Sequence, residues 1–239
     1  MWIKICGTTN LEDAQLGAAL GADAIGFVFA ASKRQVTPRQ VAAIVPHLPP
    51  HIERVGVFDT QNAEEIAAIA LAAGLSAVQL HSAPDEGLVV RLAQRFAGTL
   101  RIVPTLHWQV APPPLDPQQH QSTNRTQGSA ATLLAAQIQR IASLGATDRI
   151  LIDSKVGAAS GGTGVPFDWA AARAAFASAP GSVHLVLAGG LTPENVAQAI
   201  AQLHPWGVDV SSGVEAAPGR KGPALVERFI AAARATDKP

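Results

Sequence analysis

The chain has 239 residues, of which 48% are hydrophobic and 15% charged, and its 18 basic and 18 acidic side chains balance to a formal net charge of zero. This composition is sufficient for the core of one large domain, and the charge balance gives no support for nucleic acid or an anionic membrane as a partner. The single cysteine, Cys6, excludes an intramolecular disulfide and a metal cluster built from cysteines.

The N-terminal run leads directly into a predicted strand, with no apolar signal segment of the usual length. The longest uncharged stretch, residues 174–193, is interrupted by Ser, Pro, Gly and His, which is typical of a helix end, a turn and a strand. A membrane span needs a longer uninterrupted apolar run. We therefore expect a soluble, cytoplasmic protein.

Short apolar runs alternate with capped helical segments along the whole chain. Strands are expected over residues 3–6, 24–29, 54–58, 77–81, 101–105, 184–188 and 207–211, with a further one that ends at Asp153. Helices are expected over residues 9–21, 37–46, 63–73, 85–97, 130–144 and 223–235, with two more that begin at Phe167 and Thr192. Thr9 with Glu12 and Thr37 with Gln40 match capping boxes. Strand–helix units joined by short connections predict a parallel sheet closed into a single-domain α/β fold, a (β/α)8 TIM barrel.

Residues 108–128 interrupt this regular succession. They are rich in Pro, Gln, Ser and Thr and show no apolar periodicity. We expect an exposed, mobile insertion where the fifth strand ends. Loops of this length are either functional, for instance as a lid, or disordered, and the polar composition favours disorder.

Asp153 is the first candidate for chemistry. In its strand Leu151 and Asp153 point one way and Ile150 and Ile152 the other. An ionisable group on an apolar strand is costly unless it is hydrogen-bonded or faces a cleft, although an Asp can also simply cap the following turn. Catalytic groups of such barrels lie at the C-terminal ends of strands, where Asp153 is expected.

Three loops of small residues follow the last three predicted strands: residues 161–164, 189–190 and 211–213. Glycines allow backbone N–H groups to approach an anion closely. Barrel phosphate sites are usually built from the loops after strands seven and eight. The sequence therefore predicts a phosphate site there.

Three further side chains have both a structural and a functional interpretation. Cys6, which shares a strand face with Lys4, could fill space, or serve as a base if a nearby ammonium or a helix N-terminus lowers its pKa. His81 could line the mouth of the barrel or be structural. Arg34 could be half of a solvated pair with Lys33, or hold a carboxylate in a bidentate fork. The histidines show no metal-ligand spacing, so no metal site is expected.

The motifs taken together resemble phosphoribosylanthranilate isomerase of tryptophan biosynthesis, over nearly the whole chain. They are Lys4-Ile5-Cys6-Gly7, Gly26-Phe27-Val28-Phe29 with Ser32-Lys33-Arg34, Val78-Gln79-Leu80-His81, Asp153 with the run from Gly161 to Trp169, Leu187-Ala188-Gly189-Gly190-Leu191, and the run from Asp209 to Glu215. Individually the glycine motifs occur in other phosphate-binding barrels. The combination of Lys-x-Cys-Gly with Ser-Ser-Gly-Val-Glu is far more specific.

The resemblance implies an Amadori rearrangement of N-(5-phosphoribosyl)anthranilate to 1-(2-carboxyphenylamino)-1-deoxyribulose 5-phosphate, without metal or cofactor. Asp153 would be the general acid and Cys6, as thiolate, the general base. Arg34 would hold the anthranilate carboxylate and Asp209 the anilino nitrogen. The backbone around Gly162, Gly190, Ser212 and Gly213 would hold the phosphate, and Gly164, Gly189 and Ser211 are further implied substrate-binding residues. The expected partner is this small phosphorylated substrate, and the chain could be a monomer or a homodimer.

Some positions depart from the family pattern, and rival readings remain. Lys33 stands where proline is usual, and Asp59-Thr60 where Val-Asn is usual. These differences bear on how the loops are held and on substrate affinity, and they remove none of the proposed catalytic groups.

Two other phosphosugar barrels are rival interpretations. Indole-3-glycerol-phosphate synthase needs a catalytic lysine and an extra N-terminal helix, and a ribulose-phosphate epimerase needs metal ligands beyond His81 and Asp153. A barrel that binds phosphate without catalysis is a third alternative.

Overall fold

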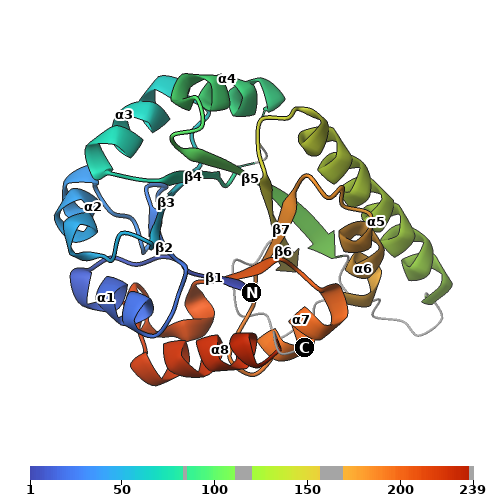
Figure 1. Ribbon diagram of the computed structural model, residues 1–239. Helices are drawn as coiled ribbons and strands as arrows, with labels where there is room; N and C mark the ends of the chain where they lie inside the picture. The colour runs from blue at the N-terminus through green and yellow to red at the C-terminus, as the bar shows by residue number, and fades with distance from the viewer. Residues whose placement is uncertain (83–84, 111–119, 157–168, 237–239) are drawn as a thin grey trace.

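The computed structural model describes residues 1–82, 85–110, 120–156 and 169–236. Within these residues the strands form a closed parallel barrel in sequence order, and β8 pairs back with β1. The strands are β1 Trp2–Ile5, β2 Ala24–Val28, β3 Glu53–Phe58, β4 Ala77–Leu80, β5 Arg101–Val110, β6 Arg149–Val156, β7 His184–Ala188 and β8 Gly207–Val210. The helices lie around them (Figure 1): α1 Leu11–Ala19, α2 Pro38–Ile44, α3 Ala63–Ala73, α4 Glu86–Phe96, α5 His120–Ser143, α6 Trp169–Ala177, α7 Val196–Leu203 and α8 Pro223–Ala235. The predicted (β/α)8 barrel is confirmed.

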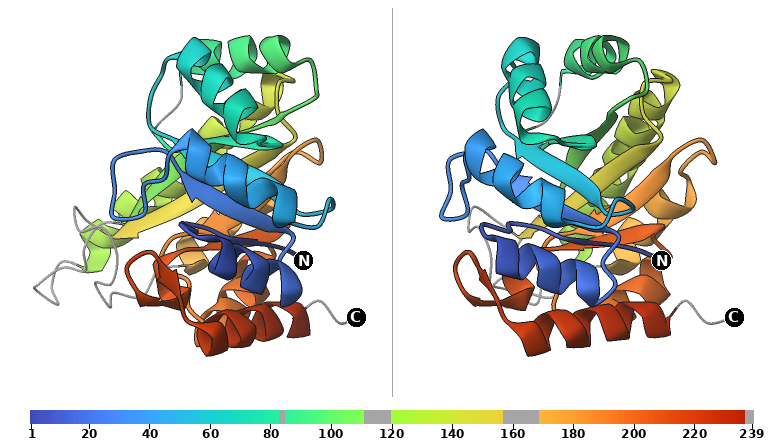
Figure 2. Two further views of the ribbon diagram at one scale, coloured as in Figure 1. Left: turned by 90° about the vertical axis from the view of Figure 1, so that its left-hand side faces the viewer. Right: turned by 60° about the vertical axis from the view of Figure 1, so that its left-hand side comes forward.

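Four shorter elements lie in the connections of the described residues. The 3-10 helix η1 (Val45–His47) follows α2. After β8 come the 3-10 helix η3 (Ser212–Val214) and an antiparallel hairpin of β9 (Glu215–Ala217) and β10 (Arg220–Lys221). Figure 2 shows this hairpin at one end of the barrel, and the start of the chain and the last turn of α8 at the opposite end.

Successive side chains of each strand point alternately outward, toward the surrounding helices, and inward, into the barrel. Outward residues such as Ile3 and Ile5 are fully buried and pack in the large apolar core that also contains residues of the surrounding helices. Burial of each such side chain contributes about 1.5–3 kcal/mol. Inward residues are partly polar, and Lys4, Gln79 and Asp209 meet inside the barrel. The expected split between Asp153 and the outward Ile152 is confirmed, because Ile152 lies in the apolar core.

Helix boundaries follow local chemistry. The predicted capping box of Thr37 and Gln40 is present, and Gly74 ends α3 in a left-handed conformation. The predicted box of Thr9 is wrong by one residue. Asn10 caps α1, and the hydroxyl of Thr9 instead donates to the carbonyl of Gly219 at 2.7 Å.

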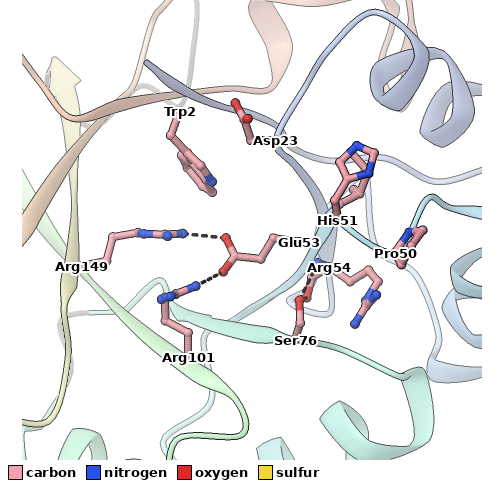
Figure 3. A pocket seen from close by; sticks show the side chains of 10 residues that line it. Trp2, Asp23, Pro50, His51, Glu53, Arg54, Ser76, Arg101 and Arg149 are labelled. Carbon is pink, nitrogen blue, oxygen red and sulfur yellow. Dashed lines mark hydrogen bonds and ion pairs between the residues drawn. The ribbon is translucent and has the colours of Figure 1, made fainter.

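The end of the barrel where the strands begin is closed by an ion-pair cluster (Figure 3). Glu53 accepts from Arg101 and, at 2.6 Å, from Arg149. The Arg149 guanidinium lies over the rings of Trp2 and Trp206, 4.4 and 4.5 Å from their centroids. Burial lowers the pKa of Arg149, although Glu53 opposes this effect. We name the cluster of Glu53, Arg101 and Arg149 the barrel floor. A pocket of about 420 Å³ lies against it.

The region predicted as an insertion is partly regular. β5 continues to Val110 and α5 begins at His120, so both elements extend into the 108–128 range, and residues 111–119 lie outside the described part. β5 is longer than predicted because it stays paired with β6, in a register that runs from Thr105 with Leu151 to Val110 with Val156. In the described residues, no helix combines the length and apolar character needed to cross a membrane.

Candidate active site

The candidate site lies where the strands end. Cys6 directly follows β1, and its backbone N–H donates to the carbonyl of Val210 in β8 at 2.8 Å. Asp153 is an inner residue of β6, and Ser211 directly follows β8. Parallel strands of a closed barrel all end at one mouth, so the topology brings these predicted residues to the same face.

Cys6 is buried above Lys4 on the inner face of β1. Gly26 on the neighbouring strand makes the space for both side chains, because a Cβ there would lie 2.7 Å from the Cys6 Sγ and 2.8 Å from the Lys4 Cε. The Gly26-Phe27-Val28-Phe29 motif is thus tied to the cysteine by packing.

Lys4 links Cys6 to two polar side chains across the barrel. Its Nζ donates to Gln79 Oε1 at 2.8 Å and to Asp209 Oδ2 at 2.9 Å, with all three residues buried. Burial opposes the charge on Lys4, but the Asp209 carboxylate outweighs it and raises the pKa of Lys4. The second Asp209 oxygen, Oδ1, is buried and accepts no hydrogen bond from the described residues.

Burial sets the direction of the Cys6 pKa. It raises the pKa of the thiol, and the Asp209 carboxylate adds to this effect. The ammonium groups of Lys4 and Lys221 lower it, as a nearby ammonium should, but they do not outweigh burial. In the unliganded site the neutral thiol is therefore favoured.

Arg34 is held in a bidentate ion pair near the mouth. Its Nε and Nη2 donate to the two carboxylate oxygens of Glu215, each at 2.7 Å. Lys221 donates to Glu215 Oε1 at 3.3 Å and to the carbonyl of Ser211 at 3.1 Å. Burial opposes ionisation of Glu215, but Arg34 and Lys221 outweigh it and lower its pKa.

Gly7 brings this ion pair close to the cysteine. A Cβ at Gly7 would lie 2.6 Å from both the Arg34 Cδ and the Ser211 Oγ. The residue after Cys6 therefore has to be small for the Arg34 stem and the end of β8 to pack over it.

Asp153 faces His107, which in turn contacts His81. In the parallel register His107 of β5 is the partner of Asp153, and its Nδ1 lies 3.8 Å from Asp153 Oδ2. The Nε2 of His107 is 2.7 Å from the carbonyl oxygen of His81, and the two imidazole rings meet edge to face. Sequence reasoning missed His107 because it ended this strand at Thr105, although Arg101, Val103, Thr105 and His107 continue the inward alternation.

The glycine loops after β7 and β8 pack directly on one another. Gly189 and Gly190 have positive φ angles of 90° and 64°, which glycine adopts without strain. A Cβ at Gly213 would overlap the carbonyl oxygen of Leu191, so only glycine allows the two loops to touch. Ser212 begins η3 beside this contact. Gly162 and Gly164 lie outside the described residues.

Asn195 braces the first of these loops. Its amide nitrogen donates to the carbonyl of Gly190 at 3.0 Å, and its Oδ1 accepts from the backbone N–H of Thr192 at 2.8 Å. The helix predicted from Thr192 therefore begins later, at Val196, because Thr192 and Asn195 form a bracing turn first.

Known proteins match both the chain and the fold. Residues 3–111 and 117–232 match the family described as N-(5'phosphoribosyl)anthranilate (PRA) isomerase. N-(5'-phosphoribosyl)anthranilate isomerases from Deinococcus radiodurans and Pelobacter propionicus are 42% and 39% identical, and the alignments cover 97% and 98% of this chain and 96% of each relative.

Solved structures agree with the sequence matches. The crystal structure of phosphoribosyl anthranilate isomerase from Thermotoga maritima has a TM-score of 0.78 at 35% identity, covering 98% of this chain and 99% of that one. A structure of such an isomerase in complex with reduced 1-(o-carboxyphenylamino)-1-deoxyribulose 5-phosphate has a TM-score of 0.74 at 33% identity, with the same coverage. With its closed barrel and its match over nearly its whole length, the chain belongs to the N-(5'-phosphoribosyl)anthranilate isomerase family.

Proposed function

We propose that this chain carries out its family's reaction in the cytoplasm by acid–base catalysis, with Asp153 as general acid and Cys6 as general base. The substrate is N-(5'-phosphoribosyl)anthranilate and the product is 1-(2-carboxyphenylamino)-1-deoxyribulose 5-phosphate, an intermediate of tryptophan biosynthesis. The observation that carries this assignment is that a carboxyl group and a thiol stand on inner positions at the same mouth of the barrel, on β6 and directly after β1.

The first step opens the sugar ring. Asp153 donates a proton to the furanose oxygen while the C1–O bond breaks, and the anilino nitrogen lone pair forms a C=N bond to C1. The product of this step is a cationic Schiff base with a free hydroxyl group at C4. Asp153 leaves the step as a carboxylate.

The second step removes the proton from C2. Cys6 as thiolate takes it, and the C–H electron pair neutralises the Schiff base to give an enolamine, which tautomerises to the ketone. Because burial raises the pKa of Cys6, the thiolate is a minor form in the free protein. The cationic Schiff base favours a neighbouring negative charge, so the thiolate is more stable once the ring has opened.

The remaining contacts orient the substrate. Arg34 would hold the anthranilate carboxylate with the edge of its guanidinium that Glu215 leaves unused. Asp209 Oδ1 would accept from the anilino N–H. Backbone N–H groups of the loops at Gly190 and Ser212–Val214 would bind the phosphate, as at other barrel phosphate sites.

Turnover by substituted proteins tests the two catalytic roles. Cys6→Ser and Asp153→Asn are each expected to reduce kcat by about 10²–10⁴-fold, the usual contribution of a general acid or base. Binding of the reduced product analogue should change little. Asp85→Asn is the matched control, because Asp85 is an exposed N-cap residue of α4 whose side chain makes no capping hydrogen bond. Full turnover by either catalytic variant would refute that residue's role.

A further inference from the structure

The pocket against the barrel floor lies at the end of the barrel opposite the mouth, and the mechanism above does not use it. Its volume of about 420 Å³ falls within the range of about 300–1,000 Å³ that is usual for small-molecule sites. Three arginines and two carboxylates line it (Figure 3): Arg54, Arg101, Arg149, Asp23 and Glu53. The lining therefore has one positive charge in excess.

The two carboxylates of the lining are already engaged. Asp23 accepts from Arg234, which lies outside the lining, at 2.7 Å. Glu53 is shared, because one of its oxygens accepts from Arg101 and the other from Arg149. A single carboxylate thus serves two guanidinium groups, and neither carboxylate is left over for a third.

Arg149 retains unused hydrogen-bond donors. A guanidinium has five N–H groups, but among the described residues only Nη1 of Arg149 finds an acceptor, Glu53 at 2.6 Å. The Nε of Arg149 is buried and has no partner there, and only 5% of the side chain is exposed. Arg101, by contrast, also donates to Asp148. Burial lowers the pKa of Arg149, and Glu53 does not offset this effect, so a second anion nearby would be favourable.

Arg54 supplies a guanidinium that has no counter-ion. It follows Glu53 on β3, and successive strand side chains point to opposite sides, so it takes no part in the ion pairs of the floor. Within the described chain its side chain forms no ion pair, and its Nε is buried without a partner. Its backbone is fixed, because its N–H donates to Ser76 Oγ at 2.8 Å. The charge is therefore held at the pocket without compensation.

We infer that the floor pocket is a binding site for a small organic anion with a carboxylate or phosphate group, which Arg54 holds. The planar guanidinium fork matches both anionic groups. The unused donors of Arg149 are offered to a second polar group of the same ligand, and the indole of Trp2 gives it an apolar wall. This inference does not rest on the proposed reaction, because Cys6 and Asp153 lie at the mouth.

Titration calorimetry of the full chain tests the site with two probes, inorganic phosphate and succinate, at constant ionic strength. The mouth is first filled with the reduced product analogue, since the proposed phosphate loops there would also bind phosphate. We predict saturable binding of a single probe ion to the analogue-filled protein. Saturation by phosphate alone would identify a phosphate group as the recognised chemistry, and saturation by succinate a carboxylate. Saturation by neither probe would overturn the inference.

Substitution of Arg54 places the binding at the floor. Arg54→Gln leaves the ion pairs of Glu53 intact and should weaken probe binding about 10–100-fold, the usual effect of losing charge-assisted hydrogen bonds. Arg54→Lys keeps the charge but loses the fork, so its affinity should be intermediate. Arg39→Gln is the matched control, because Arg39 is an exposed residue of α2 outside the lining and carries the same charge. Equal affinity of Arg54→Gln and Arg39→Gln would overturn the inference.

Turnover distinguishes failure of this inference from failure of the proposed function. Arg54 lies at the floor, so Arg54→Gln should keep a normal kcat while its probe affinity falls. Normal turnover of a chain whose floor binds neither probe would refute the floor site alone. Probe binding that depends on Arg54 in a chain without isomerase activity would refute the proposed function and leave the floor site standing.

Discussion

Burial of the Cys6 thiol has two opposite effects on its proposed role as a base. It shields the sulfur from solvent, but it also raises the pKa of a thiol that must ionise for that role. Lys4 reduces the rise in pKa while it is itself held by Asp209 and Gln79. One ammonium group therefore connects the proposed base to the carboxylate that is proposed to contact the anilino nitrogen.

The raised pKa predicts how stability depends on pH. In the folded state the neutral thiol is favoured, so the contribution of Cys6 is fully present below the ordinary thiol pKa of about 8.5 and is lost as pH rises through the higher folded value. Urea unfolding between pH 7 and 10.5 should show the unsubstituted protein losing stability relative to Cys6→Ser above about pH 8.5. Parallel curves for the two proteins would contradict the burial argument.

At the scale of elements, the β9–β10 hairpin contributes to the site although it is outside the barrel. Glu215 begins β9 and Lys221 ends β10; Glu215 binds the Arg34 guanidinium, and Lys221 in turn donates to Glu215. The backbone N–H of Lys221 also donates to Asp13 in α1 at 2.9 Å. The hairpin is thereby attached to the first strand–helix unit, where Cys6 lies.

Removing the Glu215 charge should weaken substrate binding more than chemistry. Glu215→Gln loses charge-assisted hydrogen bonds worth about 1.5–3 kcal/mol, and Arg34 is then no longer held in place. We expect KM to rise about 10–100-fold with kcat changed much less, in steady-state assays. Glu12→Gln is the matched control, since its ion pair with Arg220 is exposed. A normal KM in Glu215→Gln would show that Arg34 does not depend on this pair.

The sequence predicts elements well where local residues decide them. Thr37 with Gln40 and Gly74 sit at the helix ends that their chemistry predicts. Contacts between distant segments could not be predicted in this way. The partners Arg34 and Glu215 are 181 residues apart, and the full length of β5, and with it the position of His107, depends on its pairing with β6.

At the scale of the whole molecule, polar chemistry occurs at both ends of the barrel. The mouth carries the proposed reaction, and the floor carries Glu53 between Arg101 and Arg149 (Figure 3). Strand alternation and the motifs predicted the barrel, and they predicted that Cys6, Asp153 and Ser211 lie where its strands end. The floor was not predicted, because single charged residues at strand starts give no pattern in the sequence.

The floor should contribute to stability and not to turnover. Glu53→Gln leaves the buried Arg149 guanidinium without its counter-ion, which typically costs about 3–5 kcal/mol. Asp148→Asn, which removes only the exposed partner of Arg101, should cost about 1 kcal/mol or less. Urea unfolding measures both, and kcat of the folded variants should remain normal. Equal stability of the two variants would contradict the assigned role of Glu53.

The central claim is that one carboxyl group and one thiol at the barrel mouth perform the isomerisation. Its most direct test follows anthranilate fluorescence after freshly formed N-(5'-phosphoribosyl)anthranilate is mixed with the protein. We predict rapid conversion of the substrate signal by the unsubstituted chain and by Asp85→Asn, and conversion about 10²–10⁴-fold slower with Asp153→Asn. Absence of conversion by the unsubstituted chain, or full conversion by Asp153→Asn, would contradict it.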